Sequence, residues 1–144
     1  MTERKYLPSL ADLVDRLTIV QLKMIFIPEH REEYMLERDL IEHDIDLILS
    51  GLDKKIGATE LRAIVVLMLA NRYIWENESQ ARSGGSEQDK LLKLTHSING
   101  VRNTAKNVIA EMHGGRKDFK IDCLAADLDP QFGNWSSLLG RRRS

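Results

Sequence analysis

Residues 86–113 read SEQDKLLKLTHSINGVRNTAKNVIAEMH, and apolar residues recur through this stretch at alternating spacings of three and four. At 3.6 residues per turn, such spacing places the apolar residues on one stripe of a helix. The stripe consists of Leu91, Leu94, Ile98, Val101, Ala105, Val108 and Met112. The segment therefore predicts one long, packed helix in an all-helical domain.

A line of polar side chains, poor in acids, runs about a third of a turn away from this stripe. It consists of His96, Asn99, Arg102, Asn103 and Lys106. Amide and guanidinium donors suit a phosphate or a carboxylate, and arginine can bind either bidentately. The line indicates a binding surface for an anion or, alternatively, a solvated flank of the helix.

Three further helices are expected upstream, over residues 9–27, 29–50 and 58–82. The first begins with Ser9 as N-cap and Asp12 three residues later, a capping-box pattern, and Pro28 ends it. The second ends at Gly51. A connector of only four residues, 83–86, separates the last two helices, so these should form an antiparallel hairpin.

The apolar residues of these helices predict how they pack. Residues 19–27 are apolar nearly all round, which is typical of a helix in the centre of a bundle or in a subunit interface. Residues 29–52 carry two apolar lines and should touch two neighbours. One line is Tyr34, Ile41, Ile45, Ile48 and Leu52, and the other is Leu36, Leu40 and Leu47.

The fold expected from these patterns is all-α, with four long helices in a bundle. The bundle domain spans residues 1–115, and an irregular or partly extended C-terminal arm spans residues 116–144. The arm ends in an arginine cluster, residues 141–143. Because several helices exceed 20 residues, the fold is either a long bundle or an intertwined dimer, and we expect a homo-oligomer.

Composition narrows the class of protein. A chain of 144 residues can bury a core without disulfides or metals to stabilise it. Its net charge of −1 provides no global field to attract nucleic acid. The longest apolar run, residues 64–70, is too short to span a bilayer. The single cysteine, Cys123, excludes an internal disulfide. We expect a cytoplasmic protein that binds neither nucleic acid nor membranes.

Asn71 and Glu78 are the first candidate site residues, because they fall inside the apolar stripe of residues 58–82. A carboxylate in that position is costly unless it is paired or ligated. The hairpin register places Asn71 near His96 and Asn99. It places Glu78 near Lys90 and Lys93. These residues predict a pocket in the bundle; alternatively, Glu78 turns to solvent and pairs with Arg82.

The first helix carries charges at Asp12, Asp15, Arg16 and Lys23 although it is otherwise strongly apolar. Charges on such a helix indicate a site. The alternative is an intrahelical pair between Asp12 and Arg16, four residues apart, with Lys23 on a solvated edge.

A metal site is the third candidate. Asp39, Glu42, His43 and Asp46 share one face of the second helix. Oxygen-rich ligation suits Mg or Mn, and the imidazole admits a transition metal. The alternative is an acidic, solvated face.

Two parts of the chain resemble small all-helical proteins of unknown function from tailed phages and bacterial polysaccharide loci. The first is residues 9–19, SLADLVDRLTI, with Lys23, and the second is residues 75–78, WENE, with Ile98, Asn99 and Arg102. That family implies no established activity. It points to six positions worth testing, namely Asp15, Arg16, Lys23, Glu78, Asn99 and Arg102.

The acidic second helix is loosely similar to the MazG-like all-α nucleoside triphosphate pyrophosphohydrolases. Those enzymes hold Mg with E-E-x-x-E on one helix and E-x-x-D on the next. Here Glu32 and Glu33 are followed by Glu37 one residue too late, and no E-x-x-D follows on a paired helix.

The leading functional hypothesis is a helical binding or interaction protein that needs no cofactor. Its partner is another protein or an anionic small molecule in a pocket between the first, third and fourth helices. The residues assigned to that pocket are Asp15, Arg16, Lys23, Asn71, Glu78, Asn99 and Arg102. The alternative is a Mg-dependent pyrophosphohydrolase using Asp39, Glu42, Asp46 and Glu78, so the sequence leaves open whether the protein is an enzyme.

Overall fold

The computed structural model describes the backbone of residues 7–82 and 88–113 and the side chains of residues 7–80 and 97–112. Within these ranges the protein is all-α and contains no strand, as predicted. The elements are α1 (Leu10–Phe26), a 3₁₀ turn η1 (Pro28–His30), α2 (Arg31–Ser50), α3 (Ala58–Arg82) and α4 (Gln88–His113). The predicted arm, residues 116–144, and the connector before α4 lie outside the described residues.

The start of α1 is held by the predicted capping box. The Asp12 amide donates to Ser9 Oγ at 3.2 Å, and the Ser9 amide donates to Asp12 Oδ2 at 3.1 Å. Two backbone donors at the helix start are thereby satisfied. At the other end Pro28 opens η1, which turns the chain into α2.

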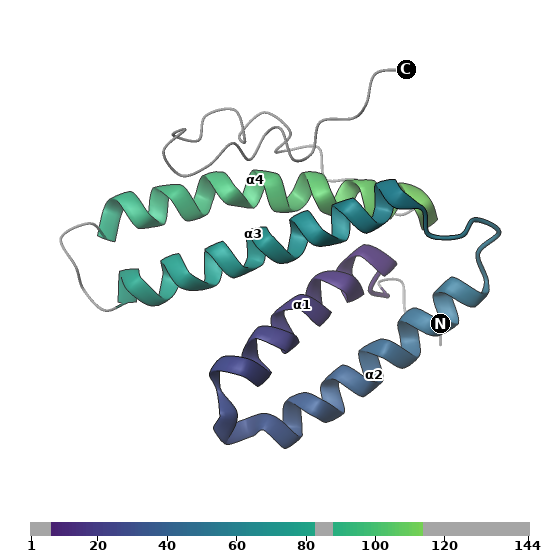
Figure 1. Ribbon diagram of the computed structural model, residues 1–144, viewed down its shortest axis with the longest axis horizontal. Coiled ribbons are helices and arrows are strands. Elements are labelled where there is room, and N and C mark those ends of the chain that lie inside the picture. The colour runs from purple at the N-terminus through teal and green to yellow at the C-terminus, as the bar shows by residue number, and fades with distance from the viewer. Residues whose placement is uncertain (1–6, 83–87, 114–144) are drawn as a thin grey trace, which may run out of the picture.

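The helices pack as a hairpin with a second pair laid against it. Helices α3 and α4 run antiparallel along most of their length, and α1 packs against both of them and against α2 (Figure 1). Helix α1 is therefore central, but Leu10, Ala11 and Val14 of its first half contribute its part of the main core. In the apolar second half, Ile25 and Phe26 are 57% and 45% exposed, so a central position for those residues is not confirmed. Helix α2 packs mainly against α1, on the outside of the molecule.

One core cluster joins α1, α3 and α4, and a smaller one joins α1 to α2. In the first, Ile98, Val101 and Ala105 of the α4 stripe are completely buried, beside Leu67 and Ala70 of α3. The second cluster consists of Leu13, Val20 and Ile41, with partly buried neighbours around them. These clusters confirm the α4 stripe wherever its side chains are described.

The two apolar lines of α2 have different surroundings. Ile41, Ile45 and Ile48 pack against α1 and the core. Leu36, Leu40 and Leu47 are 67%, 70% and 60% exposed. The prediction of a second neighbour for α2 is therefore wrong within the described chain, because the second line points away from every described helix.

Helix α3 also leaves apolar side chains exposed. Leu61, Val65 and Leu69 recur every four residues on its outer face, and each is about half exposed. No described helix is long and apolar enough to cross a bilayer.

Candidate functional site

Asp15 lies at the centre of a buried polar network between three helices. Asp15 is 6% exposed, and its side chain faces inward from α1. One turn later on the same face, Thr18 is also buried, and its hydroxyl donates to the Asp15 carbonyl at 2.7 Å. This bond satisfies the Thr18 donor within α1 and leaves its oxygen free to accept from another helix.

Arg102 from α4 binds the Asp15 carboxylate with two nitrogens. Its Nε donates to Oδ1 at 3.1 Å, and its Nη2 donates to Oδ2. This fork is the strongest geometry available to an arginine and a carboxylate, since both oxygens receive a charged donor. The pair joins residues 87 positions apart in the chain.

Asn71 from α3 completes the connection. Its Nδ2 donates to Asp15 Oδ1 at 2.8 Å and to Thr18 Oγ1 at 2.6 Å. The Asn71 residue is 2% exposed, so an unpaired amide there would be costly. Asp15 and Thr18, one turn of α1, thus bind Asn71 of α3, and Asp15 also binds Arg102 of α4.

Lys106 extends the network towards the surface. Its Nζ lies 3.1 Å from Asp12 Oδ1 and 3.7 Å from Asp15 Oδ2. Burial opposes ionisation of Asp12, but the Ser9 backbone amide, the Lys106 ammonium and the Ser9 side chain outweigh it and lower the pKa of Asp12. Two carboxylates of α1 therefore face two cations of α4, and the charges balance.

The network can lock helices together more readily than it can bind an anion. The guanidinium fork of Arg102 is occupied by Asp15, and the Lys106 ammonium is shared by two aspartates. An incoming phosphate or carboxylate would have to displace a carboxylate that the fold already holds in place. Such a fully paired buried cluster fixes which faces of the helices meet.

The structure brings together three of the seven residues assigned to the pocket, namely Asp15, Asn71 and Arg102. Arg16 is exposed and points away from them. Lys23 lies further along α1, with its ammonium 5.5 Å from the centre of the Tyr34 ring. The described contacts of the network include neither Glu78 nor Asn99, which are both half-buried.

Two details of the network differ from the sequence-based expectations. The hairpin register related Asn71 to Asn99, whereas the Asn71 amide donates to Asp15 and Thr18 of α1, because α1 packs against both helices of the hairpin. Asp12 pairs with Lys106 of α4 in place of Arg16. Thr18 was not among the predicted site residues; its signal in the sequence is a second polar residue one turn from Asp15 in an apolar helix.

The predicted metal ligands on α2 are exposed. Arg38 Nη2 lies 2.9 Å from Asp39 Oδ1, and Arg38 Nε lies 4.0 Å from Glu42 Oε1. His43 Nδ1 lies 3.1 Å from Asp44 Oδ1. Asp46 is exposed as well. Among the described side chains, those of residues 7–80 and 97–112, no three His, Cys, Asp or Glu residues are arranged to hold a metal ion.

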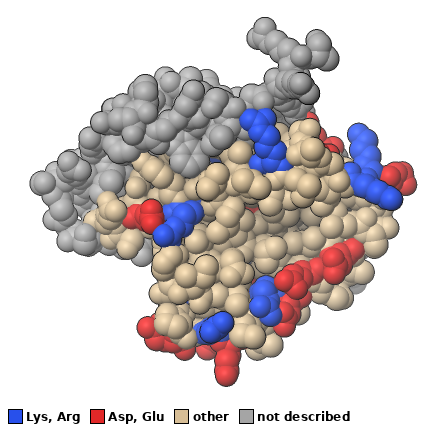
Figure 2. Space-filling view, in the orientation of Figure 1, with Lys and Arg blue, Asp and Glu red and all other residues tan. Residues whose placement is uncertain are grey.

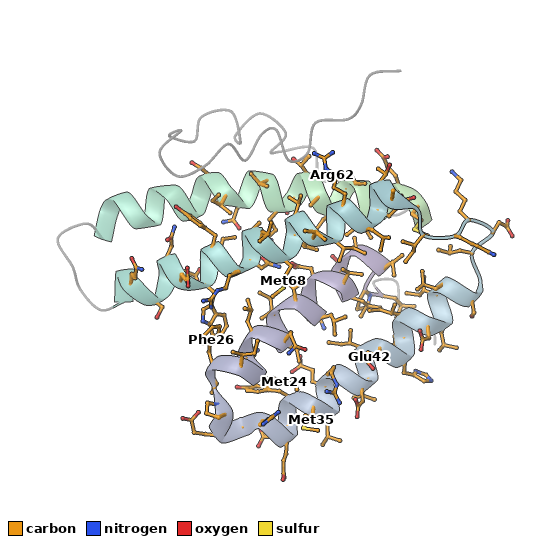
Figure 3. The ribbon with its side chains drawn as sticks, in the orientation of Figure 1. Met24, Phe26, Met35, Glu42, Arg62 and Met68 are labelled. Atoms are coloured by element: carbon orange, nitrogen blue, oxygen red, sulfur yellow. The ribbon has the colours of Figure 1, made fainter. Side chains whose placement is uncertain are left out.

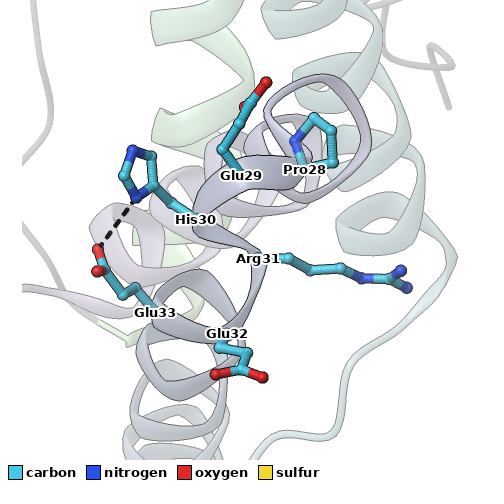
Figure 4. Close-up of a pocket in the computed structure, with 6 residues that line it drawn as sticks. All are labelled: Pro28, Glu29, His30, Arg31, Glu32 and Glu33. Atoms are coloured by element: carbon cyan, nitrogen blue, oxygen red, sulfur yellow. Dashed lines mark ion pairs between the residues drawn. The ribbon is translucent and has the colours of Figure 1, made fainter.

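An open hollow of about 390 Å³ lies at η1, between α1 and α2 (Figure 4). Its lining is one continuous segment, residues 28–33, all of it exposed. Within it, His30 Nδ1 lies 3.9 Å from a Glu33 carboxylate oxygen. Because no buried polar group faces this hollow, it does not resemble a built ligand site.

A stacked aromatic pair joins the end of α1 to α3. The Phe26 and Trp75 rings lie 6.1 Å apart at 29°, and the Arg72 guanidinium lies 4.4 Å from the Phe26 ring centre. Figure 3 shows Phe26 reaching from the end of α1 towards α3. Stacking and cation–π contact stabilise this junction, so these side chains have a packing role.

Comparison with known proteins shows no relative: the chain matches no protein-family model, no curated protein and no solved structure. The resemblance to the helical phage and bacterial proteins therefore stays a prediction.

Proposed function

We propose that this protein is a helical interaction protein whose binding surfaces are the exposed apolar faces of α2 and α3. The observation that supports the proposal is the contrast between the paired polar network of Asp15, Asn71 and Arg102 and two apolar lines that the described helices leave exposed. Contiguous exposed apolar side chains on a folded domain mark sites of protein–protein contact. The anionic ligand is the weaker hypothesis, because Arg102 and Lys106 already bind carboxylates of α1.

The α3 face, defined by Leu61, Val65 and Leu69, is the surface we assign to self-association. Its three side chains span slightly more than two turns of helix. They are followed by an Arg72–Glu76 ion pair at 2.6 Å. Charges of both signs adjoin the face, so a second copy related by a two-fold axis meets no excess of like charge. This assignment accounts for the expected homo-oligomer.

The test is sedimentation velocity on the full chain over a wide range of protein concentration. We expect a concentration-dependent dimer, which Val65→Gln weakens about tenfold or more, because a two-fold interface contains each substituted side chain twice. The matched control is Leu40→Gln, which makes the same kind of change on α2 and should leave the dimer intact. A monomer at every concentration, or equal effects of the two substitutions, would contradict the assignment.

The pyrophosphohydrolase hypothesis lacks a comparable supporting observation. Asp39, Glu42 and Asp46 are exposed on α2, and Arg38 lies against two of them. Two-metal and one-metal phosphate chemistry requires carboxylates converging from more than one element.

A further inference from the structure

We propose that the outer face of α2 binds a positively charged amphipathic helix of a partner protein. This inference rests on the proposed function and deepens it, since it names the chemistry of one partner. The surface, here called the α2 seam, consists of Leu36, Leu40, His43 and Leu47. All four residues are exposed, and α1 packs on the opposite side of α2.

The spacing of the α2 seam is that of a coiled coil. Its residues follow one another at intervals of four, three and four, which is the a/d pattern of a heptad repeat. From Leu36 to Leu47 the seam covers about 17 Å, or three turns. A helix is therefore the partner element whose own a/d residues can pack along it.

The inner face of α2 follows from the same heptad. Tyr34, Ile41, Ile45 and Ile48 take the positions on the far side from the seam, and these residues pack against the rest of the protein. Helix α2 is thus apolar on two faces, and the described chain covers one of them. The heptad pattern of the uncovered face is not needed to attach α2 to α1.

Charge selects the partner. Within Arg31–Ser50 there are seven acidic and two basic residues, a net charge of −5. The positions that flank the seam in the heptad are all acidic: Glu32, Glu37, Asp39, Asp44 and Asp46. Every one of these side chains is exposed, and acidic side chains gather over α2 in the surface view (Figure 2).

These charges argue against a second copy on this face. Flanking positions of one helix meet flanking positions of its partner, so two α2 seams would bring acid against acid. A helix with leucines along its seam and lysines or arginines beside them satisfies both features. The same acidic border disfavours an anionic membrane or a nucleic acid.

The experiment is fluorescence anisotropy of labelled helical peptides added to the full-length protein. One peptide carries leucine at a and d with lysine at the flanking positions. The second has glutamate in place of lysine, and the third has serine in place of leucine. We expect the leucine–lysine peptide to bind about tenfold tighter than either of the others, and added salt to weaken it.

Variants of the protein locate the site. Leu40→Gln should weaken the leucine–lysine peptide about tenfold, because that residue lies at the centre of the seam and is exposed in the free protein. Glu37→Lys with Asp44→Lys should shift the preference towards the leucine–glutamate peptide. Val65→Gln, on α3, is the matched control and should change nothing.

The outcomes are separable from those of the proposed self-association. Equal binding of the lysine and glutamate peptides, or binding unaffected by Leu40→Gln, would overturn the assignment of the α2 seam whatever the oligomeric state. Loss of the dimer in Val65→Gln with unchanged peptide binding would support both proposals: self-association through the α3 face and peptide binding by the α2 seam. A dimer that is lost in Leu40→Gln would show that a second copy occupies the seam and would also overturn this inference.

Discussion

The junction of α1, α3 and α4 and the outer face of α2 are opposite in character. At the junction, Asp15, Thr18 and Asn71 are buried polar groups with partners from other helices or turns. On α2, three leucines are more than half exposed. Burial in this protein therefore follows from which helix faces meet, and not from side-chain polarity alone. Buried polar groups that are hydrogen-bonded to each other specify how the helices are arranged. Exposed apolar side chains indicate a surface that binds another protein.

The largest effect should come from removing the centre of the network. Asp15→Ala leaves the Arg102 fork and the Asn71 amide without their acceptor, so we expect the free energy of unfolding to fall by about 3 kcal/mol. Urea denaturation measures it. The control is Arg16→Ala at the next, exposed position, which should stay within about 0.5 kcal/mol of the unsubstituted protein. A loss below about 1 kcal/mol for Asp15→Ala would mean that the network does not hold the helices.

A smaller loss is expected at Asn71. Asn71→Ala removes one donor that serves two acceptors and opens a small space in the core, which should cost about 2 kcal/mol. In a double-mutant cycle, the variant with both Asn71→Ala and Asp15→Ala should lose less stability than the sum of the two single losses. We expect this difference, the coupling energy, to be about 1 kcal/mol. Strict additivity would contradict a direct Asn71–Asp15 interaction. Gln21→Ala, an exposed amide on the same helix as Asp15, provides the control for urea denaturation.

The Asp12–Lys106 pair should produce an acid-dependent effect of modest size. Because the folded protein lowers the pKa of Asp12, the unfolded chain binds this proton at a higher pH than the folded chain. The contribution is fully present above the ordinary value of 3.8 and is lost as pH falls from there through the lower folded-state pKa. Thermal unfolding of Asp12→Asn should show a destabilisation at neutral pH that shrinks in acid. A destabilisation that is independent of pH would exclude the ion pair as its cause.

The smallest effect should come from the apolar side of the comparison. Leu40→Gln changes a side chain that is mostly in water, so the free energy of unfolding of the monomer should move by no more than about 0.5 kcal/mol. Urea denaturation at low protein concentration measures it. A loss of about 2 kcal/mol would show that this leucine is buried by the chain's own packing, and the α2 seam would then be part of the core.

Much of the fold could be predicted from short-range patterns. The start of α1 depended on Ser9 and Asp12, and its end on Pro28, because capping and the missing proline donor act within a few residues. The beginning of α3 at Ala58 and its end at Arg82 likewise agreed with the pattern. The α4 stripe predicted burial of Ile98, Val101 and Ala105, since one helical face has a fixed period.

Partners across helices were harder to predict. Asn71 and Arg102 were each recognisable as polar residues on a helix that packs, but the acceptor common to both is on α1, far away in the chain. The hairpin register could relate α3 only to α4, so it could not indicate the acceptors of Asn71 on α1. Nothing local to Asp12 distinguished Arg16, four residues away, from Lys106 as its partner.

The helices, their caps and the apolar lines of side chains can be predicted from the sequence, because they depend on interactions between residues a few positions apart. Packing in three dimensions set two further features: Asp15 is shared by two other helices, and the described residues cover one of the two apolar lines of α2. Helix faces select their neighbours by three-dimensional packing, and a periodic pattern records that a face is apolar without recording what covers it.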